Sequence, residues 1–256
     1  MTVAERINGE RVVVLGWGRA ILLQVAHPLV AAGVAEHSRF TGHRFARLGR
    51  LHSSIRAMRR LTFGDEQAVR ATAAAINRIH DRVNGTLREP AGPYPERTPY
   101  SAADPALLAW VHATLLDSLP LAYERFVGPL TEADKDAFCA ESSAAARLLR
   151  LPEEGIIATR AQLERYMRQM LSSPQITVTP TARRLAAELL YPPLGDATRP
   201  AAWLVRLVTL GLLPPRIREA YGFPWRASDE RRLERLTAAS RRVRLLLPAL
   251  LARWPG

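Results

Sequence analysis

Hydrophobic residues recur at three- and four-residue spacing along most of the chain, which is the spacing of one face of an α-helix. Pro28 is expected to kink the first long helix, and Pro120 is expected to interrupt the helix that begins after Asp104. Only 12–15 and 176–179 look like strands, and they are too short and too few for a fold based on a sheet. The expected helices cover 16–34, 44–61, 65–85, 104–119, 131–151, 160–171, 180–190, 201–213 and 228–242.

These helices are separated by short breaks, with one proline-rich loop at 86–100. No internal repeat or low-complexity linker divides the chain, so we expect one all-α domain over 1–256. The segment 65–85 carries its apolar residues on one helical face. These are Val69, Ala73, Ile76, Ile79 and Val83.

A single histidine, His80, falls within that apolar stripe, four residues after Ile76 and three before Val83. It is therefore predicted to point into the core, where its ring nitrogens need partners. A metal, or the iron of a haem, is one such partner, and a backbone carbonyl is another. Periodicity leaves both interpretations open, and a histidine satisfied by the backbone is the commoner case.

Further polar residues lie in apolar or helical settings. Glu36 is a candidate general base, although a glutamate more often caps a helix or bridges at a surface. Arg50 and Ser54 are one helical turn apart, and Arg50 is a candidate clamp for a carboxylate, or simply a surface arginine. His27 precedes Pro28 and is a candidate ligand, or a partner for a backbone group that the proline frees.

Charge and cysteine content narrow the function classes. The formal net charge is +12, and among 36 basic residues only Lys135 is a lysine. Acidic residues are interspersed, so we expect a solvated arginine-rich surface rather than a specific nucleic-acid site. Cys139 is the only cysteine, which excludes a disulfide within the chain and any cysteine-based metal cluster. Phosphate-binding, dinucleotide-binding and zinc-protease motifs are absent from the sequence.

The N-terminus has no secretion-signal pattern, and the apolar stretches are interrupted by Arg19, Gln24 and Arg206. We therefore expect a cytoplasmic protein without a transmembrane segment. The C-terminal segment 241–251 is basic and then rich in leucine. It is a candidate for contact with a membrane surface, but packing as a terminal core helix is the preferred interpretation.

The order of these segments resembles a known family. The chain is similar to the oxygenases grouped with the fungal mycophenolic-acid pathway oxygenase and the catalytic domain of the bacterial latex-clearing rubber oxygenase. The similar segments span most of the chain in the family's order and lie at 21–40, 49–66, 76–85, 100–118, 123–130 and 212–225.

The resemblance implies an all-α fold with a globin-like core and haem b as cofactor. It implies that His80 is the axial iron ligand, that Arg50 and Ser54 lie near the haem, and that Glu36 is a base. Ser54 stands where the relatives carry threonine, which keeps the hydroxyl group. Ser53 replaces a basic residue that is often found beside that threonine.

The function expected from this resemblance is a haem b-dependent oxygenase. Its substrate is expected to be hydrophobic, an unsaturated isoprenoid or lipid, with dioxygen as the second reactant and helices 104–119 and 201–213 as pocket walls. Two alternatives remain open at the sequence level: a haem-binding or sensing protein without turnover, and a haem-free helical binding protein.

Overall fold

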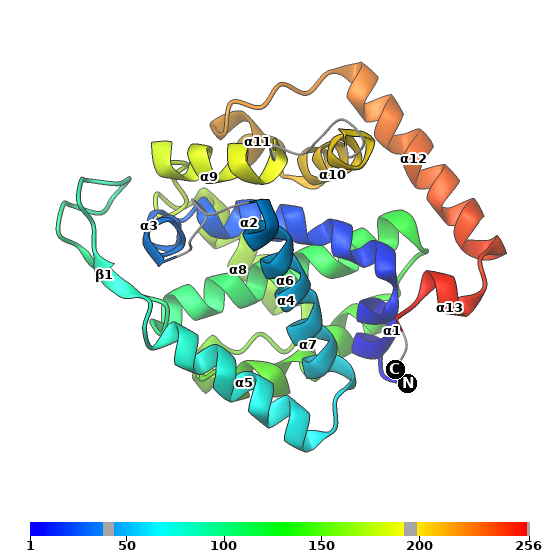
Figure 1. Cartoon of the computed structure of the whole chain (residues 1–256), viewed down its shortest axis with the longest axis horizontal. Helices are drawn as coiled ribbons and strands as arrows, with labels where there is room; N and C mark the ends of the chain where they lie inside the picture. The colour runs from blue at the N-terminus through cyan, green and yellow to red at the C-terminus, as the bar shows by residue number, and fades with distance from the viewer. Residues whose placement is uncertain (38–43, 192–198, 255–256) are drawn as a thin grey trace.

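The computed structural model describes residues 1–37, 44–191 and 199–254, with the backbone alone for 44–52. The fold is almost entirely helical, as the hydrophobic spacing predicts (Figure 1). The first half contains α1 (Val3–Gly9), the 3₁₀ turn η1 (Arg11–Leu15), α2 (Gly16–Val25), α3 (Pro28–His37), α4 (Arg44–Phe63), α5 (Glu66–His80), β1 (Asn84–Thr86), β2 (Pro99–Ser101) and α6 (Pro105–Phe126). The second half contains α7 (Glu132–Leu148), η2 (Glu153–Gly155), α8 (Arg160–Ser172), α9 (Pro180–Leu190), α10 (Arg199–Leu212), α11 (Pro215–Ala220), α12 (Ala227–Leu246) and α13 (Ala249–Ala252).

Helix α6 is the central element, and α2 packs along it. Trp110 is fully buried, and a Cβ atom at Gly16 would lie 2.8 Å from the Ser118 carbonyl oxygen, so the two helices approach closely. The expected interruption at Pro120 is wrong, because α6 continues to Phe126. Pro120 is itself buried, and packing on several sides outweighs the hydrogen bond that the proline removes.

Pro28 ends one helix and starts another, as expected. The segment Arg11–Val25 and helix α3 meet at an angle of 108° at this break.

By length and composition alone, helix α6 is apolar enough to cross a membrane. The same holds for the bent pair of Arg11–Val25 and α3 if the pair is counted as one span. More than half of the apolar window of α6 is buried inside the fold, which is typical of a core helix.

The two segments that look like strands in the sequence do not form strands. Residues 12–15 lie in the 3₁₀ turn η1, and 176–179 form no strand in the part of the chain that the structure describes. Neither segment has a neighbouring strand in the described chain with which to form backbone hydrogen bonds, so its β-branched residues do not produce a β-strand. The two observed strands lie instead at either end of the proline-rich loop, with Gly85 opposite Tyr100. A Cβ atom at Gly85 would lie 2.6 Å from the Tyr100 hydroxyl oxygen, so a larger residue at this position would displace the Tyr100 ring.

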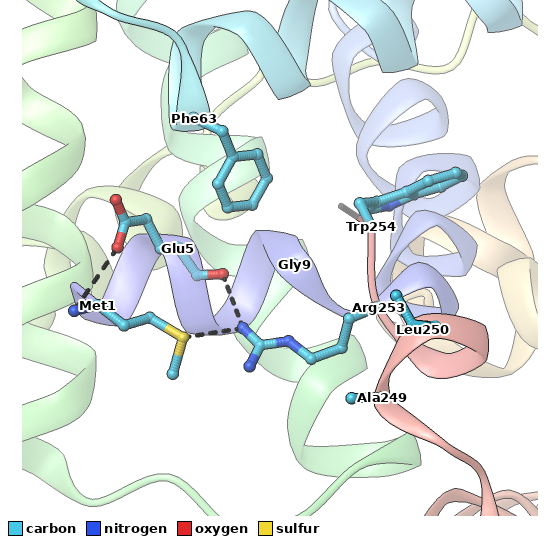
Figure 2. A pocket seen from close by; sticks show the side chains of 8 residues that line it. All are labelled: Met1, Glu5, Gly9, Phe63, Ala249, Leu250, Arg253 and Trp254. Carbon is cyan, nitrogen blue, oxygen red and sulfur yellow. Dashed lines mark hydrogen bonds and ion pairs between the residues drawn. The ribbon is translucent and has the colours of Figure 1, made fainter. Parts of the chain in front are cut away.

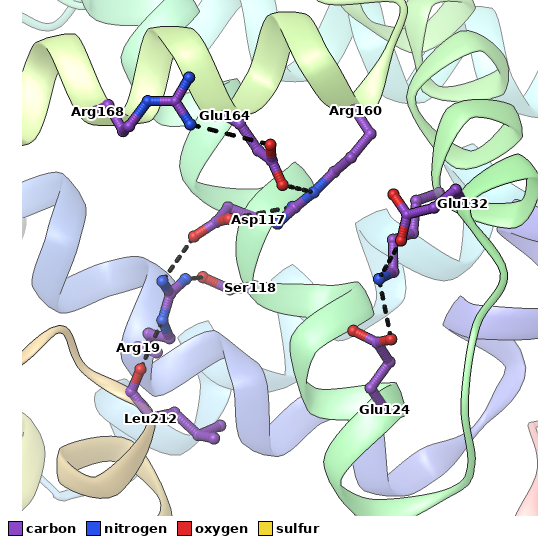
Figure 3. A network of polar contacts seen from close by, with 10 residues as sticks. Arg19, Asp117, Ser118, Glu124, Glu132, Arg160, Glu164, Arg168 and Leu212 are labelled. Atoms are coloured by element: carbon purple, nitrogen blue, oxygen red, sulfur yellow. Dashed lines mark hydrogen bonds and ion pairs between the residues drawn. The ribbon is translucent and has the colours of Figure 1, made fainter.

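A buried polar network joins three core helices (Figure 3). The guanidinium of Arg19 donates to the Leu212 carbonyl at 2.8 Å, to Ser118 Oγ at 2.7 Å and to Asp117 Oδ2 at 2.6 Å. Arg160 binds the other Asp117 oxygen at 3.4 Å. The arginine that interrupts the apolar pattern of α2 is thus fully paired and holds α2, α6 and α10 together.

The preferred core interpretation of the C-terminal leucines is also wrong. Helix α12 runs to Leu246 and the chain resumes as α13 after Pro248, but Leu245, Leu246 and Leu250 are at least 80 % exposed. Helix α12 packs through its opposite face, where Leu233 and Thr237 are buried. The helix has one core-facing stripe, and the leucines at its end lie outside that stripe.

Candidate functional site

His80 is the last residue of α5 and is half-buried. It lies seven residues, or nearly two turns, after Ala73, which is buried, so His80 shares the inner side of the helix. Ile79, predicted to lie on the same stripe, is 62 % exposed. It lies at the edge of the stripe, where the helix ends and no neighbour covers it. The core-facing side of α5 therefore centres on Ala73, Asn77 and His80.

Burial lowers the pKa of His80, an effect that Asp81 opposes and Arg150 reinforces. The imidazole is therefore neutral at pH 7, which is the form that binds metals. It makes no hydrogen bond to any side chain or backbone group that the structure describes. No group of three or more His, Cys, Asp or Glu side chains gathers around a possible metal position among those residues. The histidine thus suits a cofactor that needs one protein ligand, as haem does.

Two predicted site residues lie on α4, which packs against α5. Ser54 is half-buried there. Arg50 belongs to the same helix, but its side chain lies outside the described residues. That both side chains face His80 stays a prediction.

Glu36 lies near the end of α3 and is engaged on both oxygens. The Tyr100 hydroxyl donates to Oε2 at 2.7 Å, and the Arg88 guanidinium lies 3.2 Å from Oε1. Burial, and then the hydrogen bond and charge of Glu36, raise the pKa of Tyr100. The Nε2 atom of His37 lies 3.0 Å from the Asn84 carbonyl oxygen, which ties the same corner to β1.

The structure brings Glu36 close to the chain that follows His80. Helix α3 contacts this segment through Gly33, where a Cβ atom would lie 3.4 Å from the Val83 side chain and 3.7 Å from Tyr100. Val83 is three residues after His80. The ends of α3 and α5 and the base of the hairpin therefore form one corner of the molecule, to which two residues of the candidate site belong.

His27 is a satisfied core histidine. Its Nδ1 atom accepts from the Leu29 backbone N–H at 3.3 Å, and its Nε2 atom lies 3.1 Å from the Tyr94 hydroxyl. Burial lowers its pKa to about 4. Because both ring nitrogens are engaged, His27 has no free nitrogen for a metal, and it stabilises the break before α3 instead.

Sequence reasoning assigned no role to His112, but the structure distinguishes it from the other described histidines. Its Nε2 atom is buried and has no hydrogen-bond partner within the described residues. Burial lowers its pKa to about 4. Leu108, His112 and Leu115 lie on one face of α6 and are only half-buried, unlike Ala109 and Ala113 on the other side. A four- and three-residue spacing of Leu, His and Leu is the signal that could have found it.

A cavity of about 430 Å³ lies elsewhere, between α1, the end of α4 and the C-terminal segment (Figure 2). Phe63 lines it, just before α5 begins, whereas His80 is at the other end of α5. A helix of this length separates its ends by about 20 Å. This cavity is therefore distinct from the His80 corner.

Comparison with known proteins identifies one family. The family model described as ER-bound oxygenase mpaB/B′/rubber oxygenase, catalytic domain, matches residues 5–242. No curated protein matches the chain, and no solved structure matches it. The matched range includes most of α1, all of α2 to α11, most of α12, and all the candidate site residues.

Proposed function

The chain belongs to the family of mpaB/B′ and rubber oxygenase catalytic domains, which are oxygenases, and we propose that it uses haem b held by His80. The observation that supports this proposal most is the state of His80. It has a neutral, half-buried imidazole on the inner side of α5 and no hydrogen-bond partner within the described chain. When bound, haem supplies dioxygen binding and redox chemistry at iron.

The buried nitrogen of His112 fits the same proposal. A polar atom that is buried without a partner is costly, and it is common where a ligand completes the site. Leu108 and Leu115 beside it offer the apolar surface that a porphyrin or a hydrophobic substrate needs. We therefore place His112 in the proposed pocket, where its neutral ring can donate or accept one hydrogen bond.

We propose that Glu36 accepts a proton from the substrate. Tyr100 and Arg88 each engage one of its two oxygens, which fixes the orientation of the carboxylate. Arg50 and Ser54 are proposed to contact polar groups at the rim of the pocket, such as a carboxylate and a hydrogen-bond acceptor. They lie one turn apart on α4, the helix next to α5.

We further propose an apolar, unsaturated isoprenoid or lipid as substrate, with α6 as one wall of its site. Helix α10 stays the second proposed wall. It buries Val208 and Leu212 in a cluster with Phe126, but its residues Trp203, Leu207 and Leu210 line a cavity of about 260 Å³.

The test is the absorption spectrum of the protein produced with sufficient haem. We expect a Soret band, and we expect His80→Ala to change its position and the spin state of the iron while Ile79→Ala, an exposed neighbour, leaves both unchanged. A protein without a Soret band contradicts the cofactor proposal. An unchanged Soret band and resonance spectrum in His80→Ala contradicts the ligand. Oxygen consumption with an unsaturated lipid then separates an oxygenase from a haem protein without turnover.

A further inference from the structure

The C-terminal corner of the molecule exposes an unusual amount of apolar surface. Helix α12 runs along the outside of the fold and turns into α13 at the periphery (Figure 1). We name the residues at this turn the leucine corner. It consists of Leu245 (85 % exposed), Leu246 (84 %), Leu250 (80 %) and Leu251 (60 %). Single exposed leucines are ordinary on a protein surface, but four within seven residues mark an interaction site.

The leucine corner is fixed to the fold on both sides. Before it, Arg244 forms two hydrogen bonds of 2.7 Å with the buried Glu10. Within and after it, Arg11 donates to the Leu250 and Arg253 carbonyls, and the Trp254 N–H donates to the Gly9 carbonyl at 2.9 Å. The leucines are therefore held outward by the structure. They do not belong to a frayed end that has failed to pack.

The charge next to the leucine corner is strongly positive. After residue 230 the chain contains seven arginines and one glutamate. Arg231, Arg235 and Arg242 are exposed and have no ion pair among the described residues. Their spacing of four and seven places them on one face of α12, the same face as Leu246. That face is thus basic along the helix and apolar at its tip.

We propose that the leucine corner inserts into the surface of an anionic lipid bilayer, with these three arginines at the level of the phosphate groups. Leucine side chains gain free energy by leaving water for the acyl boundary, and arginines gain it near anionic headgroups. Because the arginines and Leu246 share one face of α12, a helix that lies along the bilayer surface presents them to it together. The cavity of Figure 2 lies on the inner side of the corner, and Leu250 lines it.

The charge favours a bilayer over a second copy of the chain. In a twofold-symmetric dimer the same patch meets itself, so the three arginines of each copy would approach those of the other. Like charges at an interface are unfavourable, and the acidic residues of α12, Asp229, Glu230 and Glu234, all lie near its beginning, away from the leucine corner. An anionic bilayer is complementary to both parts of the patch.

The first test is flotation of the full chain with vesicles of phosphatidylcholine alone or with about 30 % phosphatidylserine. We expect binding to the anionic vesicles. The variant Leu245→Ser/Leu246→Ser/Leu250→Ser/Leu251→Ser should bind about tenfold more weakly or worse. These side chains are mostly exposed, so the thermal unfolding of the variant should match that of the wild type. Unchanged vesicle binding by this variant would overturn the proposal.

The second test separates the local patch from the overall charge. Arg231→Gln/Arg235→Gln/Arg242→Gln should weaken binding to anionic vesicles on the order of 100-fold, at roughly fivefold for each arginine. A matched control, Arg97→Gln/Arg165→Gln/Arg184→Gln, removes the same charge from exposed positions on the hairpin loop, α8 and α9. The control should bind nearly as well as the wild type. Equal weakening by the two variants overturns a specific basic face.

A third measurement locates the contact directly. Cys139 is buried and its pKa is raised to about 11 by burial, so a cysteine introduced at Leu246 is the reactive thiol. An environment-sensitive dye at Leu246→Cys should shift its emission to the blue on anionic vesicles, and the same dye at Ala144→Cys on α7 should not. No shift at Leu246, or a leucine-dependent dimer without vesicle binding, overturns the proposal.

Discussion

Two buried polar regions of this molecule follow opposite rules. Around Arg19, every charged group is paired, with three hydrogen bonds between 2.6 and 2.8 Å that join α2, α6 and α10. On another face of α6, His112 keeps a buried nitrogen without a partner in the described chain, and the imidazole of His80 on α5 makes no hydrogen bond to the described residues. In the first region the polar groups are satisfied by their neighbours and hold the helices together, whereas in the second two histidine side chains keep ring nitrogens without a partner in the described chain.

Breaking the Arg19 network should give the largest effect. We expect Asp117→Ala to lower the free energy of unfolding by about 3–5 kcal/mol, because it leaves the buried guanidinium without its counter-charge. Urea denaturation followed by circular dichroism measures this change. Glu164→Ala is the control. Glu164 also pairs with Arg160, but it is 44 % exposed, so its loss should cost less than about 1 kcal/mol. Equal costs for the two variants would contradict the structural role of the network.

The buried histidines should make the protein acid-sensitive. Burial lowers the pKa of His27 to about 4, below its ordinary value near 6.5, so the folded state favours the neutral ring. The unfolded chain therefore binds the proton more readily, and stability is lost as the pH falls from about 6.5 to about 4. The loss should reach about 3 kcal/mol. His27→Gln should flatten this part of the curve of unfolding free energy against pH, and an unchanged curve would contradict the assignment.

A substitution in the second region should have the opposite sign. We expect His112→Leu to leave the apoprotein as stable as the wild type, or to stabilise it by about 1–2 kcal/mol, because it removes a buried unpaired nitrogen. His27→Leu, which removes a hydrogen-bonded histidine, should destabilise the protein by about 2 kcal/mol. Urea denaturation at pH 7 compares them. Similar destabilisation by both would mean that His112 is satisfied in solution.

The smallest effect concerns the Glu36 corner. Tyr100→Phe should cost about 1 kcal/mol, the value of one partly buried hydrogen bond to a carboxylate. If Glu36 is the base, Tyr100→Phe should also lower turnover relative to the wild type. Tyr94→Phe at the other end of the hairpin loop is the matched control, with a similar cost in stability and unchanged turnover. Equal turnover in the two variants would place Glu36 outside the reaction.

Most helices could be predicted because their ends carry local signals. The range 180–190 is reproduced residue for residue by α9, and Thr131 caps α7 through the expected capping box. Asp65 begins α5 as predicted, but the helix ends at His80 instead of Gly85, because the following residues enter the hairpin. Pro120 was misread because burial on several sides of α6 is not visible in local sequence. The globin-like core stays a prediction.

The candidate site was only partly predictable for the same reason. His80 could be found from its place on the stripe, and Glu36 from the resemblance. The hydrogen bond from Tyr100 to Glu36 joins residues 64 positions apart, and no spacing rule indicates it. The spacing of Leu108, His112 and Leu115 could have drawn attention to His112, but its lack of a partner is a property of its surroundings and is not visible in the sequence. The exposed leucines were expected in the core, because an apolar pattern does not say whether a surface is left to cover it.

The contact between the first and last helical turns has a topological consequence. The Trp254 N–H binds the Gly9 carbonyl, and an Arg253 nitrogen lies 3.0 Å from the sulfur of Met1. The two ends of the described chain therefore lie next to each other. A circular permutant that joins them by a short linker and is opened in the exposed loop near Glu96 should keep the same helical packing. Such a permutant moves both chain ends to the far side of the molecule from the leucine corner. An affinity tag fused there leaves that corner uncovered, whereas a tag joined next to Met1 or Trp254 lies beside it.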